Sequence, residues 1–182
     1  MPDSLNQIDR DIKACQRCAL RQNATQPVCG LGNIGAKYFL IGEAPGANED
    51  EVGTPFVGQA GKRLDKLLGL GKIDINDCFL SNVCRCRPPN NRDPRKQEIR
   101  SCVEFLWREI RLVKPEYLIT LGSLSLSLFC PYGIRQMHGT QFSFDLDEEK
   151  PLAASSDRRI KKKGEMKEAY AHILSGRFIS SS

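Results

Sequence analysis

Residues 36–48 read AKYFLIGEAPGAN, a short apolar run that passes directly into a loop rich in glycine and proline. An apolar run of roughly four to eight residues bounded by turn residues is typical of a buried strand. Similar runs occur at residues 78–83 (CFLSNV) and 117–121 (YLITL). We expect these three runs, together with residues 140–144, to form four strands.

Helical patterns separate the expected strands. Residues 59–70 are predicted as one helix, and Asp93 followed by Pro94 predicts the start of a longer one. Cys102 falls on the apolar face of that longer helix. Strands that alternate with helices are typical of a parallel sheet covered on both faces. The predicted fold is therefore α/β, with three α/β/α layers around a central, mostly parallel four-stranded sheet.

The loops that follow Ile41 and Val83 are the expected ligand site, because open parallel sheets bind ligands beyond the carboxyl ends of their strands. The glycine-rich loop after Ile41 could hold an anion through its N–H groups. It lacks the GxGxxG pattern of a dinucleotide site. Residues 56–63 do not complete a phosphate-binding loop either. Phe56 stands where the first glycine would be, and Arg63 replaces the Ser or Thr of that motif.

Length and charge limit the classes of partner and location that remain open for this chain. The chain has 182 residues and a formal net charge of +5, which permits a nucleic-acid partner without requiring one. We see no apolar run long enough to cross a membrane and no signal peptide, so we expect a cytoplasmic monomer with no membrane partner.

The character of the chain changes near residue 148. Residues 148–182 contain a basic run at 158–163 and a serine-rich end. We predict a domain over residues 1–147 and a divergent basic tail over 148–182. The tail is expected to contain one short helix at 166–174, and the sequence does not decide whether the rest of the tail is folded or disordered.

Cysteine is the most informative residue type in this chain, which contains eight. In a cytoplasmic protein, this number favours metal binding or catalysis over disulfides. Cys15 and Cys18 form a CxxC motif, and Cys86 and Cys102 lie far downstream in separate segments. Four thiolates could complete one metal site that ties the N-terminus to the middle of the chain. The alternative is a set of ordinary buried thiols.

Phe56 and Asn82 are candidate binding residues. Taken singly, an aromatic in a tight loop is usually part of a core, and an asparagine at a strand end usually completes a turn. If one crevice holds both, a planar base could stack on the Phe56 ring while the Asn82 amide reads its hydrogen-bonding edge.

Three motifs occur in order along the chain: the CxxC, GEAPGANEDEVGTPFVGQAGKRLDKLL (42–68) and SNVCRCRPPNNRDP (81–94). They resemble the iron–sulfur uracil-DNA glycosylases, family 4 of that superfamily, over residues 5–147. The resemblance implies a 4Fe–4S cluster instead of zinc. It assigns as cluster ligands Cys15, Cys18, Cys86 and Cys102. Cys84 is a rival for Cys86, but Cys86 directly precedes Arg-Pro-Pro, as the family's ligand does.

The same resemblance implies a DNA repair enzyme that hydrolyses the N-glycosidic bond of a flipped uracil, with uracil-containing DNA as its partner. Glu43 would be catalytic and, with the backbone of Ala44, would hold the attacking water and a uracil carbonyl. Glu49 would flank the pocket, Phe56 would stack on the base, and Asn82 would hydrogen-bond to it.

The sequence departs from the family after Phe144. The family continues into a His-Pro-Ser loop whose histidine stabilises the uracil anion, and neither His138 nor His172 stands in such a sequence. The departure implies reduced activity, because one lost anion-stabilising donor lowers the rate by about 100-fold to 1,000-fold. The alternatives are a catalytically weak iron–sulfur DNA-binding relative and a zinc-stabilised nucleotide-binding module.

Overall fold

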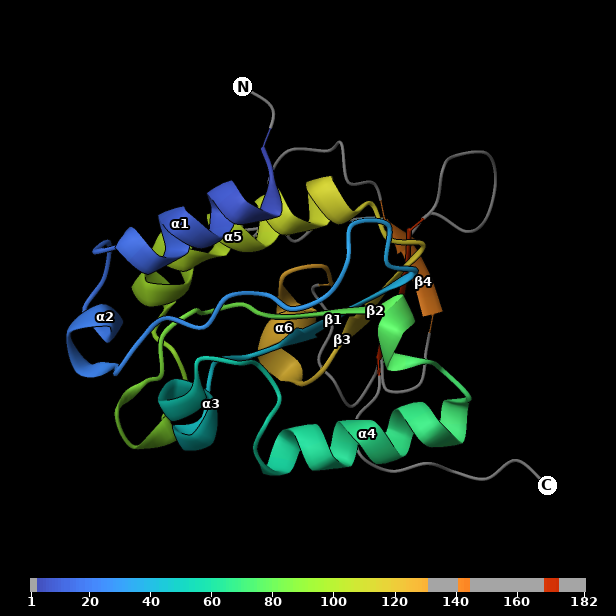
Figure 1. Ribbon diagram of the computed structural model, residues 1–182, viewed down its shortest axis with the longest axis horizontal. Helices are drawn as coiled ribbons and strands as arrows, with labels where there is room; N and C mark the ends of the chain where they lie inside the picture. The colour runs from blue at the N-terminus through green and yellow to red at the C-terminus, as the bar shows by residue number, and fades with distance from the viewer. Residues whose placement is uncertain (1–2, 131–140, 145–168, 174–182) are drawn as a thin grey trace.

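A computed structural model describes residues 3–130, 141–144 and 169–173 (Figure 1). The predicted features at His138 and at the basic run 158–163 lie outside these residues.

The centre of the fold is a parallel sheet. Strand β1 (Tyr38–Gly42) lies between β2 (Cys78–Asn82) and β3 (Tyr117–Thr120) and runs parallel to both. Strand β5 (Ala169–Ile173) pairs in parallel with β3, and β4 (Gln141–Phe144) pairs antiparallel to β5. The sheet order is β2-β1-β3-β5-β4.

The predicted α/β fold with a parallel sheet is confirmed, but the predicted number of strands is wrong. Among the described residues the sheet has five strands, and the extra one is β5. Residues 166–174 were expected to contain a helix, yet Ala169–Ile173 is a strand. The open edge of β3 explains the difference, because its backbone groups require partners that β5 supplies. The division of the chain at residue 147 stays a prediction.

Alternating residues of the central strands enter two separate cores. Phe39 and Ile41 of β1 join one core, which contains the buried faces of α1 (Leu5–Ala14) and α5 (Lys96–Val113). Leu40 joins the other core, which includes α4 (Gln59–Gly71). Figure 1 shows α1 and α5 side by side on one face of the sheet and α4 on the other. This two-sided burial accounts for the continuous apolar runs of the strands.

Short helices and turns lie between the longer elements along the chain. They are α2 (Leu20–Asn23), α3 (Ala47–Val52), α6 (Ser123–Ser127) and the 3-10 turns η1 (Ile75–Asp77) and η2 (Pro89–Asn91).

The two long helices on the first face differ in how well the sequence predicts their ends. The hydroxyl of Ser4 caps α1 by accepting from the N–H of Gln7 at 3.2 Å, as expected. Helix α5 begins at Lys96, so the predicted start at Asp93 is wrong. The carboxylate of Glu98 accepts from the Arg95 N–H at 2.7 Å, and this contact defines the first turn.

An ion-pair cluster fixes α1 against α5. Arg108 of α5 donates to Asp3 at 2.7 and 2.8 Å and to Asp11 at 2.7 Å. The hydrogen bond from Arg108 lowers the pKa of Asp3 and of Asp11. Because Cys15 directly follows α1, this cluster also fixes the position of the CxxC motif relative to α5.

No helix within the described ranges is both long enough and apolar enough to span a membrane.

Candidate functional site

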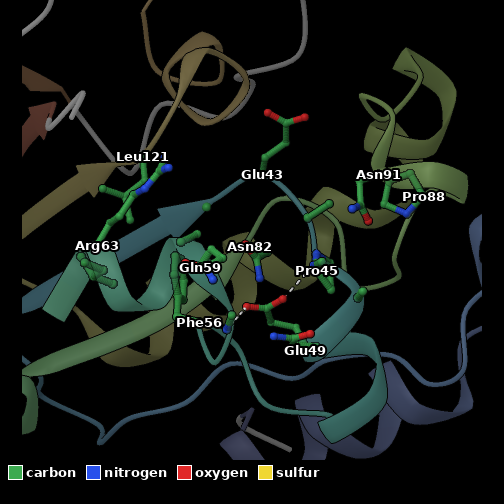
Figure 2. Close-up of a pocket in the computed structure, with 18 of the residues that line it drawn as sticks. Glu43, Pro45, Glu49, Phe56, Gln59, Arg63, Asn82, Pro88, Asn91 and Leu121 are labelled. Carbon is green, nitrogen blue, oxygen red and sulfur yellow. Dashed lines mark hydrogen bonds between the residues drawn. The ribbon is translucent and has the colours of Figure 1, made fainter.

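A pocket of about 590 Å³ opens at the carboxyl ends of β1 and β2 (Figure 2). Its walls come from the β1–α3 loop, the segment that leads into α4, the end of β2 and the η2 turn. The two loops that the sequence singled out therefore meet in one crevice, as expected for parallel strands that end at the same edge. All five predicted pocket residues line it: Glu43, Ala44, Glu49, Phe56 and Asn82.

Gly42 is the point at which Phe56 and Asn82 approach each other. It is paired with Asn82 in the sheet. A Cβ atom on Gly42 would overlap the amide oxygen of Asn82 and lie 2.9 Å from the Phe56 ring. The missing side chain therefore lets the amide and the ring approach the same spot. Asn82 is buried and Phe56 is partly buried, so part of the Phe56 side chain remains accessible.

The backbone holds Phe56 in an unusual conformation. Its φ is 58°, in the left-handed region that aromatic residues rarely adopt. A Cβ atom on Gly61 of α4 would overlap the carbonyl oxygen of Phe56, so the loop packs directly on the helix backbone. A strained aromatic at a pocket wall is typical of a binding site.

The carboxylate of Glu49 joins two loops of the pocket. One oxygen accepts from the Gly46 N–H at 3.1 Å, and the other accepts from the Gly58 N–H at 2.7 Å. Figure 2 shows both contacts as dashed lines. Glu49 is buried, and its two oxygens are used by the backbone. Its place in the pocket is therefore that of a clamp between the Glu43 loop and the Phe56 loop.

Glu43 has a different environment. Its side chain is partly buried and lies apart from that of Glu49 (Figure 2). Burial raises the pKa of Glu43, and the nearby charge of Asp93 raises it further. The carbonyl of Glu43 accepts from the Cys84 N–H at 3.0 Å, which ties the two loops together beyond the strand ends. Across the described residues, the Ala44 N–H has no hydrogen-bond acceptor and remains free for a ligand.

Asn91 is a pocket residue that the sequence reasoning missed. It lines the side opposite Phe56, and its amide oxygen accepts from Nε of Arg87 at 2.7 Å. Asn90 and Asn91 both have positive φ, at 55° and 53°. Two consecutive asparagines after a strand were the available signal, because asparagine tolerates this conformation.

The predicted cysteine ligands lie in the first core or pack against it. Cys86 and Cys102 are buried, and Cys15 and Cys18 are partly buried and pack against the same core. Burial raises the pKa of Cys86 to about 12, and the nearby thiolates of Cys102 and Cys18 contribute. The neighbouring Cys84 side chain and the positive charge of Arg85 favour the thiolate of Cys102 and lower its pKa. Five thiols therefore lie in one region.

The arrangement of these thiols in the described residues is not that of a site for a single metal ion. Among the described residues, no group of His, Cys, Asp or Glu is arranged to hold a metal ion. Two arginines lie nearby, since the charge of Arg21 acts on Cys86 and that of Arg85 acts on Cys102. Within the part of the chain that the structure describes, Nε of each arginine is buried and has no hydrogen-bond partner. Cationic side chains beside soft thiol ligands fit an anionic group that is larger than one ion.

Comparison with known proteins gives the family of this chain. The model of the uracil DNA glycosylase superfamily matches residues 29–174. The chain belongs to this superfamily. The match includes the pocket loops and both downstream cysteines, while the CxxC precedes it.

Similar proteins within the superfamily are Type-4 uracil-DNA glycosylases. The one from Archaeoglobus fulgidus is 42% identical over 66% of this chain, and the one from Saccharolobus solfataricus is 46% identical over 69%. A third, from Thermotoga maritima, is 40% identical over 67%. The aligned parts are 60%, 58% and 64% of these three relatives, so the chain matches only about three fifths of their length. The predicted resemblance to family 4 is confirmed.

Replacing Glu49 should loosen the pocket loops. In Glu49→Gln one carboxylate oxygen becomes an amide donor that cannot accept from a backbone N–H. We expect a loss of about 1–3 kcal/mol of unfolding free energy and faster amide exchange at Gly46 and Gly58.

Glu51→Gln is the matched control, because Glu51 is exposed on the same short helix. Denaturant unfolding and NMR hydrogen exchange measure both effects. Unchanged exchange at the two glycines in Glu49→Gln would show that the carboxylate does not hold these loops.

Proposed function

We propose that this chain is a uracil-DNA glycosylase, which hydrolyses the bond between uracil and deoxyribose after the nucleotide has flipped out of the DNA. The observation that carries the proposal is the convergence of Phe56 and Asn82 at Gly42, with Glu43 in the same pocket. Family membership and the Type-4 relatives support it.

The recognition step follows from the chemistry of the two side chains. Uracil presents the O4 acceptor next to the N3–H donor, and the amide of Asn82 offers a matching donor and acceptor. The ring of Phe56 offers a face on which a planar base can stack, an interaction worth about 1–3 kcal/mol. Because Asn82 is buried, only a base that has left the DNA stack could reach it.

The bond-breaking step needs charge stabilisation on both fragments. When the N1–C1′ bond breaks, its electron pair leaves with uracil and the sugar becomes cationic. A water oxygen then bonds to C1′, and the proton that this water loses neutralises the departing uracil. We assign the carboxylate of Glu43 to the water and the sugar cation, and the free N–H of Ala44 to a uracil carbonyl.

Uracil-containing DNA is the proposed partner, bound by a single chain. We further propose slower turnover than in relatives that carry the His-Pro-Ser loop. His172 lies within β5, in register with Ile119, and is therefore part of a strand. A strand position differs from the loop position that the family's histidine takes.

We also propose that a 4Fe–4S cluster is held by Cys15, Cys18, Cys86 and Cys102. Its support is the gathering of these thiols in one core beside the cations of Arg21 and Arg85. When bound, the cluster would supply a structural crosslink, since glycosidic hydrolysis transfers no electrons. The cysteines themselves would connect the end of α1, the loop after β2 and the middle of α5.

A uracil-release assay on single-stranded DNA tests the proposed enzyme. Asn82→Asp removes the donor that O4 of uracil needs and leaves an acceptor suited to the amino group of cytosine. We expect uracil release to fall and affinity to shift toward cytosine. His172→Ala is the control and should keep the wild-type rate.

Unchanged uracil release in Asn82→Asp would place the binding pocket elsewhere. Loss of release in His172→Ala would instead assign the family histidine's role to His172 and contradict the proposed slow turnover.

The pH dependence of uracil release tests the role of Glu43. Because burial raises its pKa, the required carboxylate should be lost at a pH above the usual value for glutamate as the solution is acidified. Asp93→Asn removes the nearby negative charge and should lower the pKa of Glu43. The acid limb of kcat/KM should then move to lower pH, whereas the exposed control Asp65→Asn should leave it in place. An acid limb at or below the usual pKa of glutamate would contradict Glu43 as the titrating group.

Iron content and colour test the cysteine assignment. Anaerobically purified wild-type protein should be brown and contain about four irons per chain. Cys86→Ala should lose the colour, while Cys84→Ala should retain it, because only Cys86 is a proposed ligand. Colourless wild-type protein with stoichiometric zinc would contradict the cluster, and bleaching by Cys84→Ala alone would exchange the two assignments.

A further inference from the structure

A closed hydrogen-bonded triangle is buried between β2 and α5. Arg85 donates to the hydroxyl of Ser81 at 2.6 Å and to the carboxylate of Glu109 at 2.7 Å. The Ser81 hydroxyl donates to the same carboxylate oxygen of Glu109 at 2.6 Å. The side chains of Arg85 and Glu109 are 2% and 1% exposed. The triangle therefore connects the loop after β2, the end of β2 and the long helix, with almost no access to water.

The main chain of Arg85 makes a second set of contacts. Its N–H donates to the sulfur of Cys102 at 3.2 Å, and its carbonyl accepts from the Val28 N–H at 2.7 Å. Cys84 and Cys86 flank it in the sequence. Arg85 thus contacts Cys102, a proposed cluster ligand, through its backbone. Through its guanidinium it contacts β2, the strand that carries Asn82.

Stability alone does not explain this arrangement. Burying an arginine and a glutamate costs solvation free energy, and a well-packed apolar replacement is often neutral or stabilising. Nε of Arg85 and one oxygen of Glu109 also have no hydrogen-bond partner among the residues that the structure describes. A Cβ atom on Gly30 would lie 2.7 Å from that free oxygen, so the neighbouring backbone leaves little room there. The network has a cost that a purely structural role would avoid.

The position of Ser81 shows what the network can control. Ser81 and Asn82 are consecutive in β2, so their side chains point to opposite faces of the sheet. Ser81 points toward α5 and the cysteines, whereas Asn82 lines the pocket. A constraint on Ser81 therefore also fixes the backbone that orients the Asn82 amide.

We propose that Arg85 is a positioning residue that couples the cysteine site to the base-reading end of β2. The inference rests on the proposed function of the pocket and on the proposed cluster. The backbone of Arg85 holds Cys102, and its guanidinium holds Ser81 and Glu109. At Cys102 the effect of its positive charge exceeds the opposing effect of Glu109. Loss of the cluster would release Cys86, which follows Arg85, and Cys102, which the Arg85 N–H contacts, and would thereby loosen Asn82.

The test uses two variants of the complete, anaerobically prepared protein. Arg85→Met/Glu109→Leu removes both buried charges together, so that neither is left unpaired and the fold is preserved. Arg85→Lys keeps the charge but lacks the planar guanidinium fork, whose two nitrogens contact Ser81 and Glu109 separately. The probe for the pocket is a single-stranded oligonucleotide with one 2′-fluoro-deoxyuridine, in which fluorine disfavours the sugar cation and slows hydrolysis.

Three quantities are measured: the bleaching rate of the visible absorbance in a chelator, the reduction potential of the cluster, and the affinity for the oligonucleotide. The double variant should bleach about 10-fold to 100-fold faster, as for other lost outer contacts of metal ligands. It should also have a lower reduction potential and bind the probe more weakly. It should still unfold cooperatively, although the buried Ser81 hydroxyl loses both of its hydrogen-bond partners. Arg85→Lys should keep the potential near the wild-type value and still bind the probe more weakly.

Lys37→Met/Glu116→Gln is the matched control, because it removes an exposed ion pair at the amino ends of the strands. It should match the wild type in all three measurements. If Arg85→Met/Glu109→Leu also matches the wild type in bleaching or in probe affinity, the coupling is overturned and the proposed function stands. Wild-type protein that holds no iron would overturn the coupling and the proposed cluster. Wild-type protein that does not bind the probe would overturn the coupling and the proposed function.

Discussion

The pairing of Gly42 with Asn82 is the constraint on which the pocket depends. Parallel pairing ends β1 and β2 at the same edge, so their two loops must leave the sheet side by side. Backbone hydrogen bonds continue this pairing, because Val83 and Cys84 donate to the carbonyls of Gly42 and Glu43. At this point any side chain on residue 42 would displace the Asn82 amide or the Phe56 ring. A single missing side chain thus lets the Asn82 amide and the Phe56 ring share one site.

The last two residues of β2 contribute to two different regions, the pocket and the buried network. On one face of the sheet Asn82 lines the pocket, and on the other Ser81 joins the buried network of Arg85 and Glu109. The cysteine region begins two residues beyond Asn82, at Cys84. This short separation would give the proposed cluster a structural purpose in a reaction that involves no oxidation or reduction. It would stiffen the segment that presents the amide to the base.

Sequence reasoning predicted the features that depend on local pattern. Apolar runs gave β1, β2 and β3, and motif order pointed to the residues that line the pocket. Features set by distant partners were not predictable. The strand β5 depends on the open edge of β3, and the start of α5 depends on Glu98 reaching back to the Arg95 N–H. The clamp formed by Glu49 likewise depends on two loops that meet only after folding.

A crystal structure of the protein bound to single-stranded DNA with one 2′-fluoro-deoxyuridine would test the proposed pocket most directly. The account predicts a flipped uracil stacked on the Phe56 ring, with its O4 and N3–H bonded to the Asn82 amide and C1′ facing the Glu43 carboxylate. A uracil bound outside this pocket, or one inside it that does not contact Asn82, would contradict the account.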